Sequence, residues 1–284
     1  MQHGGALAWT AWDGTSKIAY DTTTKTAYVY LTTSVKRAEP LLVESGYTLY
    51  LCLNGNDIIY DAVGGISAVK IQSGANLIIT DCRTTVGRIT HDYNTSEKTG
   101  KTGSGIYSWG ALTIWNGCVT GNNAGSSYSG GGVYIEDTGT FIMNGGSITD
   151  NITESKGGGV YIKSGATFIM NGGSITDNTA GTNGGGVYNG GTFKMSGTAS
   201  VSNNIADTNG GGVYNYGTFE MSGTATISNN TATQGGGVFN SDGTFKMSDA
   251  AVIAENTATD SGGGGSYGGG GVCNHQGTFE MSGG

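Results

Sequence analysis

The sequence has 284 residues, of which 55 are glycine and one is proline, so glycine makes up about 19% of the chain where about 7% is usual. A collagen would need glycine at every third position, and a flexible linker would lack the Phe, Met, Ile, Val and Tyr that recur here, so both classes are excluded. With only 12% charged residues and no uninterrupted apolar run of 18 or more, the chain is neither a highly charged disordered protein nor one with a transmembrane helix.

The net charge of −8 at pH 7 comes from one part of the chain. Residues 1–104 carry nine acidic and nine basic side chains, whereas residues 105–284 carry twelve acidic and four basic ones. A phosphate-binding surface needs clustered Lys and Arg, so we expect neither nucleic acid nor an anionic membrane as a partner. Met1 is followed by no basic stretch and no apolar segment, so we expect that a signal peptide and an anchor are absent here and that the chain is a fragment of a longer protein.

Residues 1–40 lie outside the repeat that fills the rest of the chain. They are rich in large aromatic residues, and the segment DTTTKTAYVYL alternates like a strand; the aromatic residues are Trp9, Trp12, Tyr20, Tyr28 and Tyr30. Because the terminal coil of a solenoid exposes core and strand edges, we predict that this segment is an N-terminal β cap. An independent Trp-based sugar site is the alternative.

Residues 41–104 are weakly repetitive. The segments SGYTLYLCLNG and SGANLIITDC are alike at an offset of 28 residues, and a long polar stretch separates Asp81 from Gly103. We predict that this region forms the irregular first coils of a solenoid that begins near Leu41.

Residues 105–284 contain a regular repeat, cut off in its last copy. The segments GGGVYIEDTGTFIMNGGSITDN from Gly130 and GGGVYIKSGATFIMNGGSITDN from Gly157 are nearly identical. The valines that follow the glycine triplets are spaced by 27, 27, 26 and 25 residues, at Val133, Val160, Val187, Val213 and Val238. Two to three dozen residues per unit are typical of a solenoid.

Each unit contains three short strand-like runs, such as TFKM, SIT and GVY, separated by turn residues, and no stretch has a helical period. We therefore predict an all-β fold, a right-handed single-stranded parallel β-helix of about eight coils stacked at about 4.8 Å. Alternation sorts the side chains into two sets: Phe141, Met143, Ile148 and Val133 point inward, and Thr140, Ile142, Ser147, Thr149 and Tyr134 point outward.

The segments GGGVYN, GTFxMSGG and SITDNTA resemble the repeats of bacterial pectin-lyase-like β-helix surface proteins. They are also similar to the GGA(I/L/V) and FxxN repeats of the polymorphic outer membrane protein adhesins, with GGGV and FxM in their place. The resemblance covers residues 105–284 strongly, 41–104 weakly and 1–40 hardly at all. It implies an exported, surface-displayed bacterial β-helix with an adhesive or scaffolding role.

One outward column is aromatic, and we predict it as the ligand-binding surface: Tyr107, Tyr134, Tyr161, Tyr188, Tyr214 and Phe239. An exposed aromatic stripe can stack against sugar rings or a protein partner. Self-stacking that stabilises the solenoid is the alternative.

Two other outward columns have different chemistry. Opposite charges alternate between neighbouring coils in the column Ile142, Ile169, Lys194, Glu220, Lys246, Glu280, and we predict that they pair and specify register. Hydroxyl side chains form a second column of pairs, as in ice-binding solenoids, at Ser147 and Thr149, Ser174 and Thr176, Ser200 and Ser202, and Thr226 and Ser228.

Metal and disulfide sites are weakly indicated. Asp150 and Asp177 are one repeat apart and could share a calcium ion, although an Asx-rich turn beside a ladder of Asn amides is favoured. His3, His91 and His275 are far apart in the sequence, so no zinc site and no cofactor are predicted. The spacings of Cys52, Cys82 and Cys118, 30 and 36 residues, permit a bridge between adjacent coils, while free thiols are equally compatible and Cys273 has no obvious partner.

Catalysis would need a charged cluster on the outer face, and one region offers it: Arg83, Arg88, Asp81, Asp92 and His91. A polar loop is the favoured interpretation. We therefore expect a non-catalytic, secreted or cell-surface adhesin-like module that binds a host or environmental glycan or protein. The alternatives are a polysaccharide lyase or hydrolase and an ice-binding solenoid. Because the last unit stops after Phe279 and Met281, end-to-end self-association is also expected.

Overall fold

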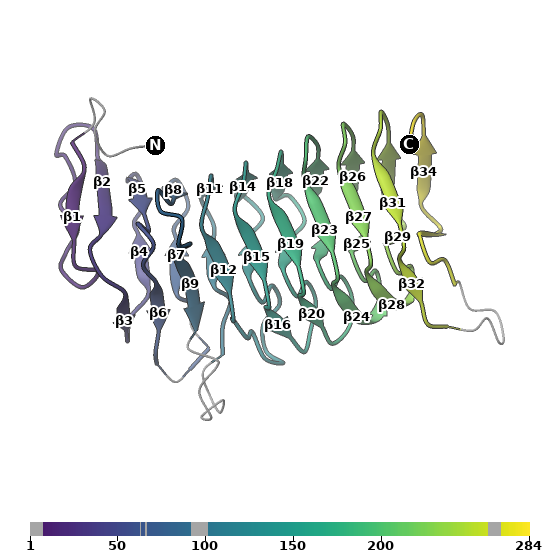
Figure 1. The fold of residues 1–284 in the computed structure, drawn as a ribbon, viewed down its shortest axis with the longest axis horizontal. Helices are drawn as coiled ribbons and strands as arrows, with labels where there is room; N and C mark the ends of the chain where they lie inside the picture. The colour runs from purple at the N-terminus through teal and green to yellow at the C-terminus, as the bar shows by residue number, and fades with distance from the viewer. Residues whose placement is uncertain (1–7, 63, 66, 92–101, 261–267) are drawn as a thin grey trace.

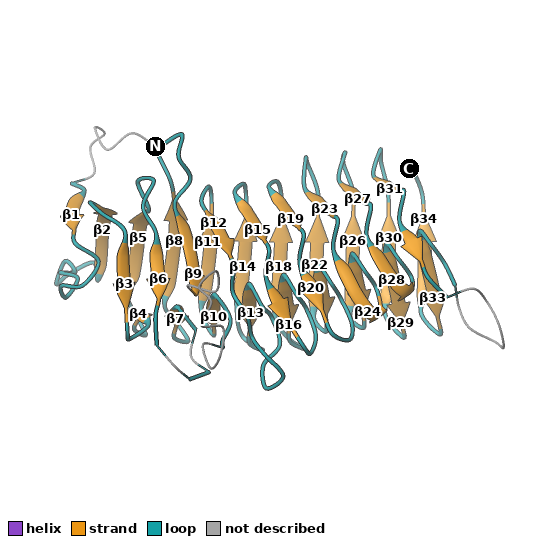
Figure 2. Ribbon diagram, turned by 60° about the horizontal axis from the view of Figure 1, so that its bottom comes forward, coloured by secondary structure: helices purple, strands orange, loops and turns teal. Residues whose placement is uncertain are grey.

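The chain is a β-solenoid of about eight turns, and the computed structural model describes residues 8–62, 64–65, 67–91, 102–260 and 268–284. Its coils follow one another along the long axis, so that the first and last strands, β1 and β34, lie at opposite ends of the molecule (Figure 1). The described residues contain strands and turns but no helix (Figure 2). The all-β solenoid predicted from the repeat is confirmed; its handedness stays a prediction.

Three long parallel sheets form the sides of the solenoid. Sheet A has eleven strands: β1 (Thr10–Trp12), β2 (Thr26–Leu31), β5 (Thr48–Cys52), β8 (Asn76–Thr80), β11 (Ala111–Ile114), β14 (Thr140–Met143), β18 (Thr167–Met170), β22 (Thr192–Met195), β26 (Thr218–Met221), β30 (Thr244–Met247) and β34 (Thr278–Met281).

Sheet B has nine strands: β3 (Val35–Arg37), β6 (Ile58–Tyr60), β9 (Arg88–His91), β12 (Cys118–Thr120), β15 (Ser147–Thr149), β19 (Ser174–Thr176), β23 (Ser200–Ser202), β27 (Thr226–Ser228) and β31 (Val252–Ala254). Sheet C also has nine: β4 (Leu41–Val43), β7 (Val69–Ile71), β10 (Ile106–Ser108), β13 (Val133–Ile135), β17 (Val160–Ile162), β21 (Val187–Asn189), β25 (Val213–Asn215), β29 (Val238–Ser241) and β33 (Val272–His275).

A fourth, shorter parallel sheet was not expected from the sequence. Sheet D links sheet B to sheet C in five consecutive coils, through β16 (Ile152–Thr153), β20 (Thr179–Ala180), β24 (Ile205–Asn209), β28 (Thr231–Gln234) and β32 (Thr257–Ala258). Three of its five strands are only two residues long, so the alternation that marks a strand in the sequence does not repeat from coil to coil.

The core consists of columns of like residues, one from each coil. Phe141, Met143, Ile148 and Val133 are all fully buried, as the alternation predicts. The phenylalanine rings of sheet A stack nearly parallel, with centroids 4.4 to 5.0 Å apart, at Phe141, Phe168, Phe193, Phe219, Phe245 and Phe279. Because each ring is covered by the rings above and below it, a single coil cannot bury its own core, and stacking of coils is required for folding.

Two ladders of asparagines run along the solenoid, and their members are buried except for the last one of each, the half-buried Asn256 and the exposed Asn274. In the first, each amide Nδ2 donates to the Oδ1 of the next coil over 2.8 to 3.0 Å, through Asn122, Asn151, Asn178, Asn204, Asn230 and Asn256. The second joins Asn189, Asn215, Asn240 and Asn274 over 2.6 to 2.7 Å. The first ladder confirms the amide ladder considered from the sequence. The second was missed, although the repeated Asn after the GGGVY segments carried the signal.

The glycine triplets occur where neighbouring coils approach closely. In five of the triplets the first glycine has φ between 61° and 71°, a conformation that other residues rarely adopt; these are Gly130, Gly157, Gly184, Gly210 and Gly235. A Cβ atom on the second glycine, Gly158, would lie 2.5 Å from the Gly185 carbonyl oxygen of the next coil. These corners therefore need glycine for two independent reasons.

Residues 10–37 extend the solenoid at its N-terminal end. Strands β2, β3 and β4 form the first complete coil, because they pair in register with β5, β6 and β7 of the next coil. Before this coil the chain adds one strand to sheet A alone, β1, and residues 13–25 then pass the positions of sheets B and C as a loop. The segment predicted as an N-terminal cap thus supplies β1, β2 and β3 together with this loop, beneath which a cavity lies.

Candidate functional site

The aromatic column lies on the outer face of sheet C, and its rings stack on one another. Consecutive tyrosines from Tyr107 to Tyr214 have centroids 4.6 to 5.0 Å apart and interplanar angles of 5° to 17°. The faces of these half-buried rings are therefore occupied by neighbouring rings, and a ligand reaches their edges and hydroxyl groups. This geometry matches the self-stacking alternative, and the use of the column for binding stays a prediction.

Phe239 differs from the tyrosines with which it aligns. Its side chain is only 5% exposed, and the centroid of its ring lies 5.5 Å from that of Tyr214 and 6.2 Å from that of His275. The accessible stripe consequently ends at Tyr214, one coil earlier than the sequence suggested.

Burial also changes the acidity of the column. It raises the pKa of Tyr134 and of Tyr188 to about 12, because the phenolate would lose solvation among the stacked rings. The pKa of Tyr107 is raised by burial and by the hydrogen bond that its hydroxyl donates to Glu136 Oε1, with the two oxygens 2.5 Å apart. The other oxygen of Glu136 accepts from Lys163 Nζ at 2.6 Å. The hydroxyl groups of these tyrosines are therefore donors at neutral pH.

A small pocket lies where the tyrosine column begins. It has a volume of about 210 Å³ and is lined by the three aromatic side chains of Tyr107, Trp109 and Tyr128, together with Lys70. Trp109 is 37% exposed and Tyr128 is 42% exposed, and the rings of Tyr107 and Trp109 have centroids 4.4 Å apart. We call this group the aromatic pocket. The sequence column did not include Trp109 or Tyr128, because both lie in turns outside the strand pattern.

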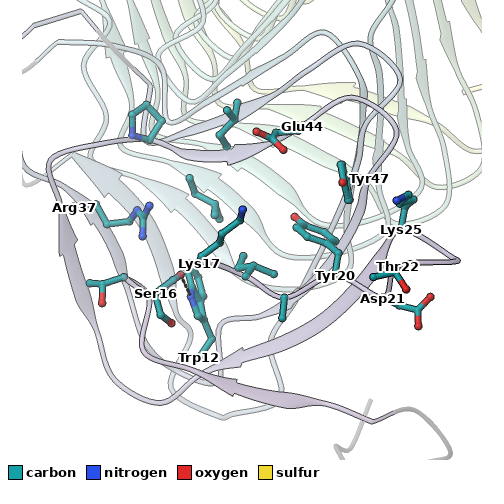
Figure 3. Close-up of a pocket in the computed structure, with 16 residues that line it drawn as sticks. Trp12, Ser16, Lys17, Tyr20, Asp21, Thr22, Lys25, Arg37, Glu44 and Tyr47 are labelled. Atoms are coloured by element: carbon teal, nitrogen blue, oxygen red, sulfur yellow. Dashed lines mark hydrogen bonds between the residues drawn. The ribbon is translucent and has the colours of Figure 1, made fainter.

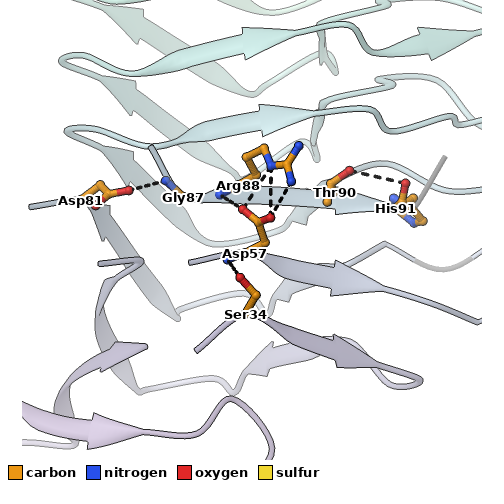
Figure 4. A network of polar contacts seen from close by, with 7 residues as sticks. All are labelled: Ser34, Asp57, Asp81, Gly87, Arg88, Thr90 and His91. Atoms are coloured by element: carbon orange, nitrogen blue, oxygen red, sulfur yellow. Dashed lines mark hydrogen bonds and ion pairs between the residues drawn. The ribbon is translucent and has the colours of Figure 1, made fainter. Parts of the chain in front are cut away.

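The charged residues considered for catalysis contact different partners and do not face a common point (Figure 4). Arg88 forms a two-pronged ion pair with Asp57, with Nη2 to Oδ2 at 2.6 Å and Nε to Oδ1 at 3.1 Å. The buried carboxylate of Asp81 accepts hydrogen bonds from the backbone amides of Gly55 and Gly87.

The remaining members of that group are not gathered around one point either. His91 is fully buried, with Nδ1 2.7 Å from Asn122 Oδ1, where it ends the first asparagine ladder. Arg83 Nε donates to Asn54 Oδ1 at 2.9 Å, and Asp92 lies outside the described residues. In this arrangement the side chains anchor turns between coils.

The acidic column occupies a turn. Asp150 and Asp177 have φ of 54° and 56°, a left-handed conformation that Asp and Asn tolerate better than other residues. Each carboxylate accepts a hydrogen bond from the hydroxyl of the preceding threonine, over 3.1 Å at Asp150 and 2.9 Å at Asp177. Within the described part of the chain, no group of three or more His, Cys, Asp or Glu side chains could hold a metal ion. A calcium role for the two aspartates stays a prediction.

The structure brings two of the cysteines together. The Sγ atoms of Cys52 and Cys82, from adjacent coils, lie 2.6 Å apart, and all four cysteines are in the thiol form. Cys118 is in β12 beside Arg88 and Ser147, and Cys273 is buried in β33, so neither joins the pair. The disulfide candidates from the sequence are thus reduced to one pair.

The other outward columns lie where alternation placed them. Lys194 pairs with Glu220 at 2.8 Å, and Lys246 pairs with Glu280 at 3.0 Å, in register across sheet A. The hydroxyl pairs of sheet B are half-buried and aligned from coil to coil; as an ice-binding surface they stay a prediction.

Comparison with protein-family models, with curated proteins and with solved structures finds no match. A search of the described residues for a helix long and apolar enough to span a membrane finds none. The site must therefore be judged by its own geometry.

Proposed function

We propose that the chain is a non-catalytic, secreted or cell-surface β-solenoid module that binds a glycan or a protein through the outer face of sheet C. The observation that carries the proposal is the aromatic pocket, where Trp109 and Tyr128 expose ring surface at the end of a row of stacked tyrosines. Tryptophan and tyrosine supply large, rigid contact area at low entropic cost, which is why they dominate binding surfaces.

The surroundings of the pocket support a role in binding. The Tyr107 hydroxyl and the pair formed by Glu136 and Lys163 place hydrogen-bonding groups beside the rings. The tyrosines are fixed by stacking, so little conformational entropy is lost when a ligand binds. An adhesive module of this type presents its surface on a rigid rod and needs no chemistry at the contact.

The test is a glycan array and a protein-binding screen on the purified chain, repeated with Trp109→Ala. We expect this variant to reduce binding tenfold or more. Trp115→Ala is the matched control, because Trp115 is 52% exposed but lies in a turn between sheets A and B, away from the pocket.

Equal loss with the two variants, or no binding partner in either screen, would contradict the proposal. Incubation with pectin, alginate and xylan tests the non-catalytic part, because release of unsaturated or reducing ends would show an enzyme. In that case Arg83→Ala and Asp81→Ala would identify whether the charged region is responsible.

A further inference from the structure

A cavity of about 550 Å³ lies at the N-terminal end of the solenoid, between residues 15–25 and strand β4 (Figure 3). It exists because sheet A has one more strand than sheets B and C at this end, β1, while sheets B and C begin in the next coil at β3 and β4. Between β1 and β2 the chain crosses the ends of those two sheets as a loop instead of as strands. The volume lies within the range of 300–1,000 Å³ that small-molecule sites occupy.

Two tyrosines form one wall of this cavity. The rings of Tyr20 and Tyr47 have centroids 4.6 Å apart and are tilted by 56°, so they do not cover one another completely. Both are half-buried and face the interior of the cavity (Figure 3). Burial, Glu44 and Tyr47 raise the pKa of Tyr20 to about 12, so its hydroxyl is a donor at neutral pH. Lys25 Nζ lies 5.8 Å from the Tyr47 centroid.

Polar groups of both signs surround the tyrosines. Lys17 points into the middle of the cavity and Glu44 lies on the strand side (Figure 3). Arg37 is fixed over the Trp12 ring at 5.7 Å and donates to the backbone carbonyls of Gly14 and Glu39. Among the described residues, none of the ion pairs within 4.0 Å involves Lys17, Lys25 or Arg37.

The edge of sheet C adds backbone groups. The Leu41 amide donates to Ala68 and the Val43 carbonyl accepts from Gln72, so both residues use their groups toward the next coil. Alternation along a strand directs the amide and carbonyl of the intervening Leu42 to the opposite side, toward the open edge. Leu42 is 42% exposed and lines the cavity.

The charges argue against an anionic ligand. Lys17, Lys25 and Arg37 are balanced by Asp21 and Glu44 in the lining, and Asp13 and Glu39 interact electrostatically with Arg37. Without a net positive field, an anion gains little from this site.

We propose that this cavity binds a sugar residue of a neutral oligosaccharide, as a second site separate from the aromatic pocket. A sugar ring has an apolar C–H face that suits the tyrosine wall. Its hydroxyl groups donate and accept hydrogen bonds, which suits the mixture of amine, guanidinium, phenol, carboxylate and backbone groups. The proposal does not depend on binding at sheet C.

The test is isothermal titration calorimetry of the chain with cellotriose, xylotriose, maltotriose and chitotriose, with trigalacturonate as the acidic comparison. We expect at least one neutral trisaccharide to bind, and we expect Tyr47→Ala and Lys17→Ala to weaken it at least tenfold. Lys36→Ala is the matched control, because Lys36 is an exposed lysine of β3 outside the cavity.

Two further measurements establish whether the sugar binds in this cavity. Trp109→Ala should leave the affinity unchanged, so failure of the sheet C proposal and failure of this one are distinguishable. Thermal melting followed by circular dichroism checks that Tyr47→Ala is folded, and the exposed Lys17→Gln supplies a second variant if it is not. Absence of neutral trisaccharide binding, stronger binding of trigalacturonate, or unchanged affinity in the Lys17 variants would overturn the proposal.

Discussion

Asn204 uses both ends of its side-chain amide inside the solenoid. Its Nδ2 donates to the carbonyls of Ile175 and Ser202 and to Asn230 Oδ1, and its Oδ1 accepts from the backbone and side chain of Asn178. Each rung therefore satisfies polar groups in three coils. A buried group left without its partner typically costs about 1–3 kcal/mol.

We predict that Asn204→Asp lowers the free energy of unfolding by at least about 2 kcal/mol, because a carboxylate cannot donate to the oxygens around it. Asn203→Asp is the control: Asn203 is exposed and has φ of 56°, in the position that Asp150 and Asp177 occupy in other coils. Urea denaturation measures both. Similar midpoints for the two variants would mean that the ladder contributes little.

The phenylalanine column gives a second prediction at this scale. Phe193 is fully buried between Phe168 and Phe219, at centroid distances of 5.0 and 4.9 Å, so truncation leaves a void that neighbouring coils cannot fill. Phe193→Ala should cost roughly 3–5 kcal/mol. The adjacent Thr192 is only half-buried, and Thr192→Ala should cost far less in the same denaturant titration. A reversed order would contradict the inward orientation of Phe193.

The neighbouring thiols of Cys52 and Cys82 give a third prediction at this scale. We expect Cys52 and Cys82 to form a disulfide with oxidised glutathione: the exposed Cys82 attacks it and releases one glutathione thiol, and Cys52 then displaces the second. Burial raises the pKa of Cys52 to about 12, so this second step should quicken as pH rises.

Peptide mapping under non-reducing conditions detects the bond. In the chain-entropy model, closing a loop of this length adds roughly 3–4 kcal/mol. Cys118 and Cys273 lie in strands β12 and β33, opposite other residues, and should stay uncrosslinked. A Cys82–Cys118 bridge would show that the corner is arranged differently.

At the scale of the element, the tyrosine column couples stability to pH. The folded-state pKa values of Tyr134 and Tyr188, about 12, lie above the ordinary value of 10.0. Unfolding therefore exposes phenols that ionise more readily, so the contribution of these two tyrosines to stability should be constant below pH 10 and should fall as pH rises from about 10 to about 12.

Titration by tyrosinate absorbance, together with thermal melts across this range, measures the effect. The double variant Tyr134→Phe and Tyr188→Phe retains the stacking and removes two ionisable groups, so its loss of stability should be smaller. An equal loss would place the source of the pH dependence outside the column.

Sheet A shows how neighbouring coils specify register. The pairs Lys194 with Glu220 and Lys246 with Glu280 are exposed, and such pairs usually contribute no more than about 1 kcal/mol. Slipping one coil by a single residue would also move buried phenylalanines to the outside. The core thus sets the register, and the charge pairs reinforce it.

For the whole molecule, the last described coil leaves part of the core accessible. Met281 is 58% exposed, and a cavity of about 280 Å³ beside it is lined by apolar side chains that include Ile253, Val272 and Phe279. Strands β33 and β34 also end their sheets, so their outer edges can pair only with another strand. A second copy of the chain provides such strands together with an apolar surface.

We therefore predict concentration-dependent association, which sedimentation velocity would detect and which Met281→Glu would abolish. Tyr216→Ser is the control, because Tyr216 is 56% exposed on the side of the solenoid and not at its end. A chain that is monomeric at all concentrations, or association that persists in the Met281 variant, would exclude this interface.

Much of the architecture was determined by the sequence alone. A repeat of fixed length places equivalent residues in line, and alternation then assigns the inside to Phe193 and the outside to Thr192 without coordinates. The same logic found the tyrosine column, the first asparagine ladder and the charge pairs of sheet A. These features are local and repeated, so each copy of the repeat confirms the others.

The tertiary structure decided what repetition cannot encode. The Asp57–Arg88 pair, the contact of Cys52 with Cys82 and the aromatic pocket each join residues in strands to residues in irregular loops, whose paths depend on packing between coils. The N-terminal cavity arises because sheet A starts one strand before sheets B and C, and the chain passes the ends of those two sheets as a loop, which no alternation pattern reveals. Whether the tyrosine rings offer faces or edges also depended on their spacing in three dimensions, because stacking at under about 5 Å leaves no room for a ligand between them.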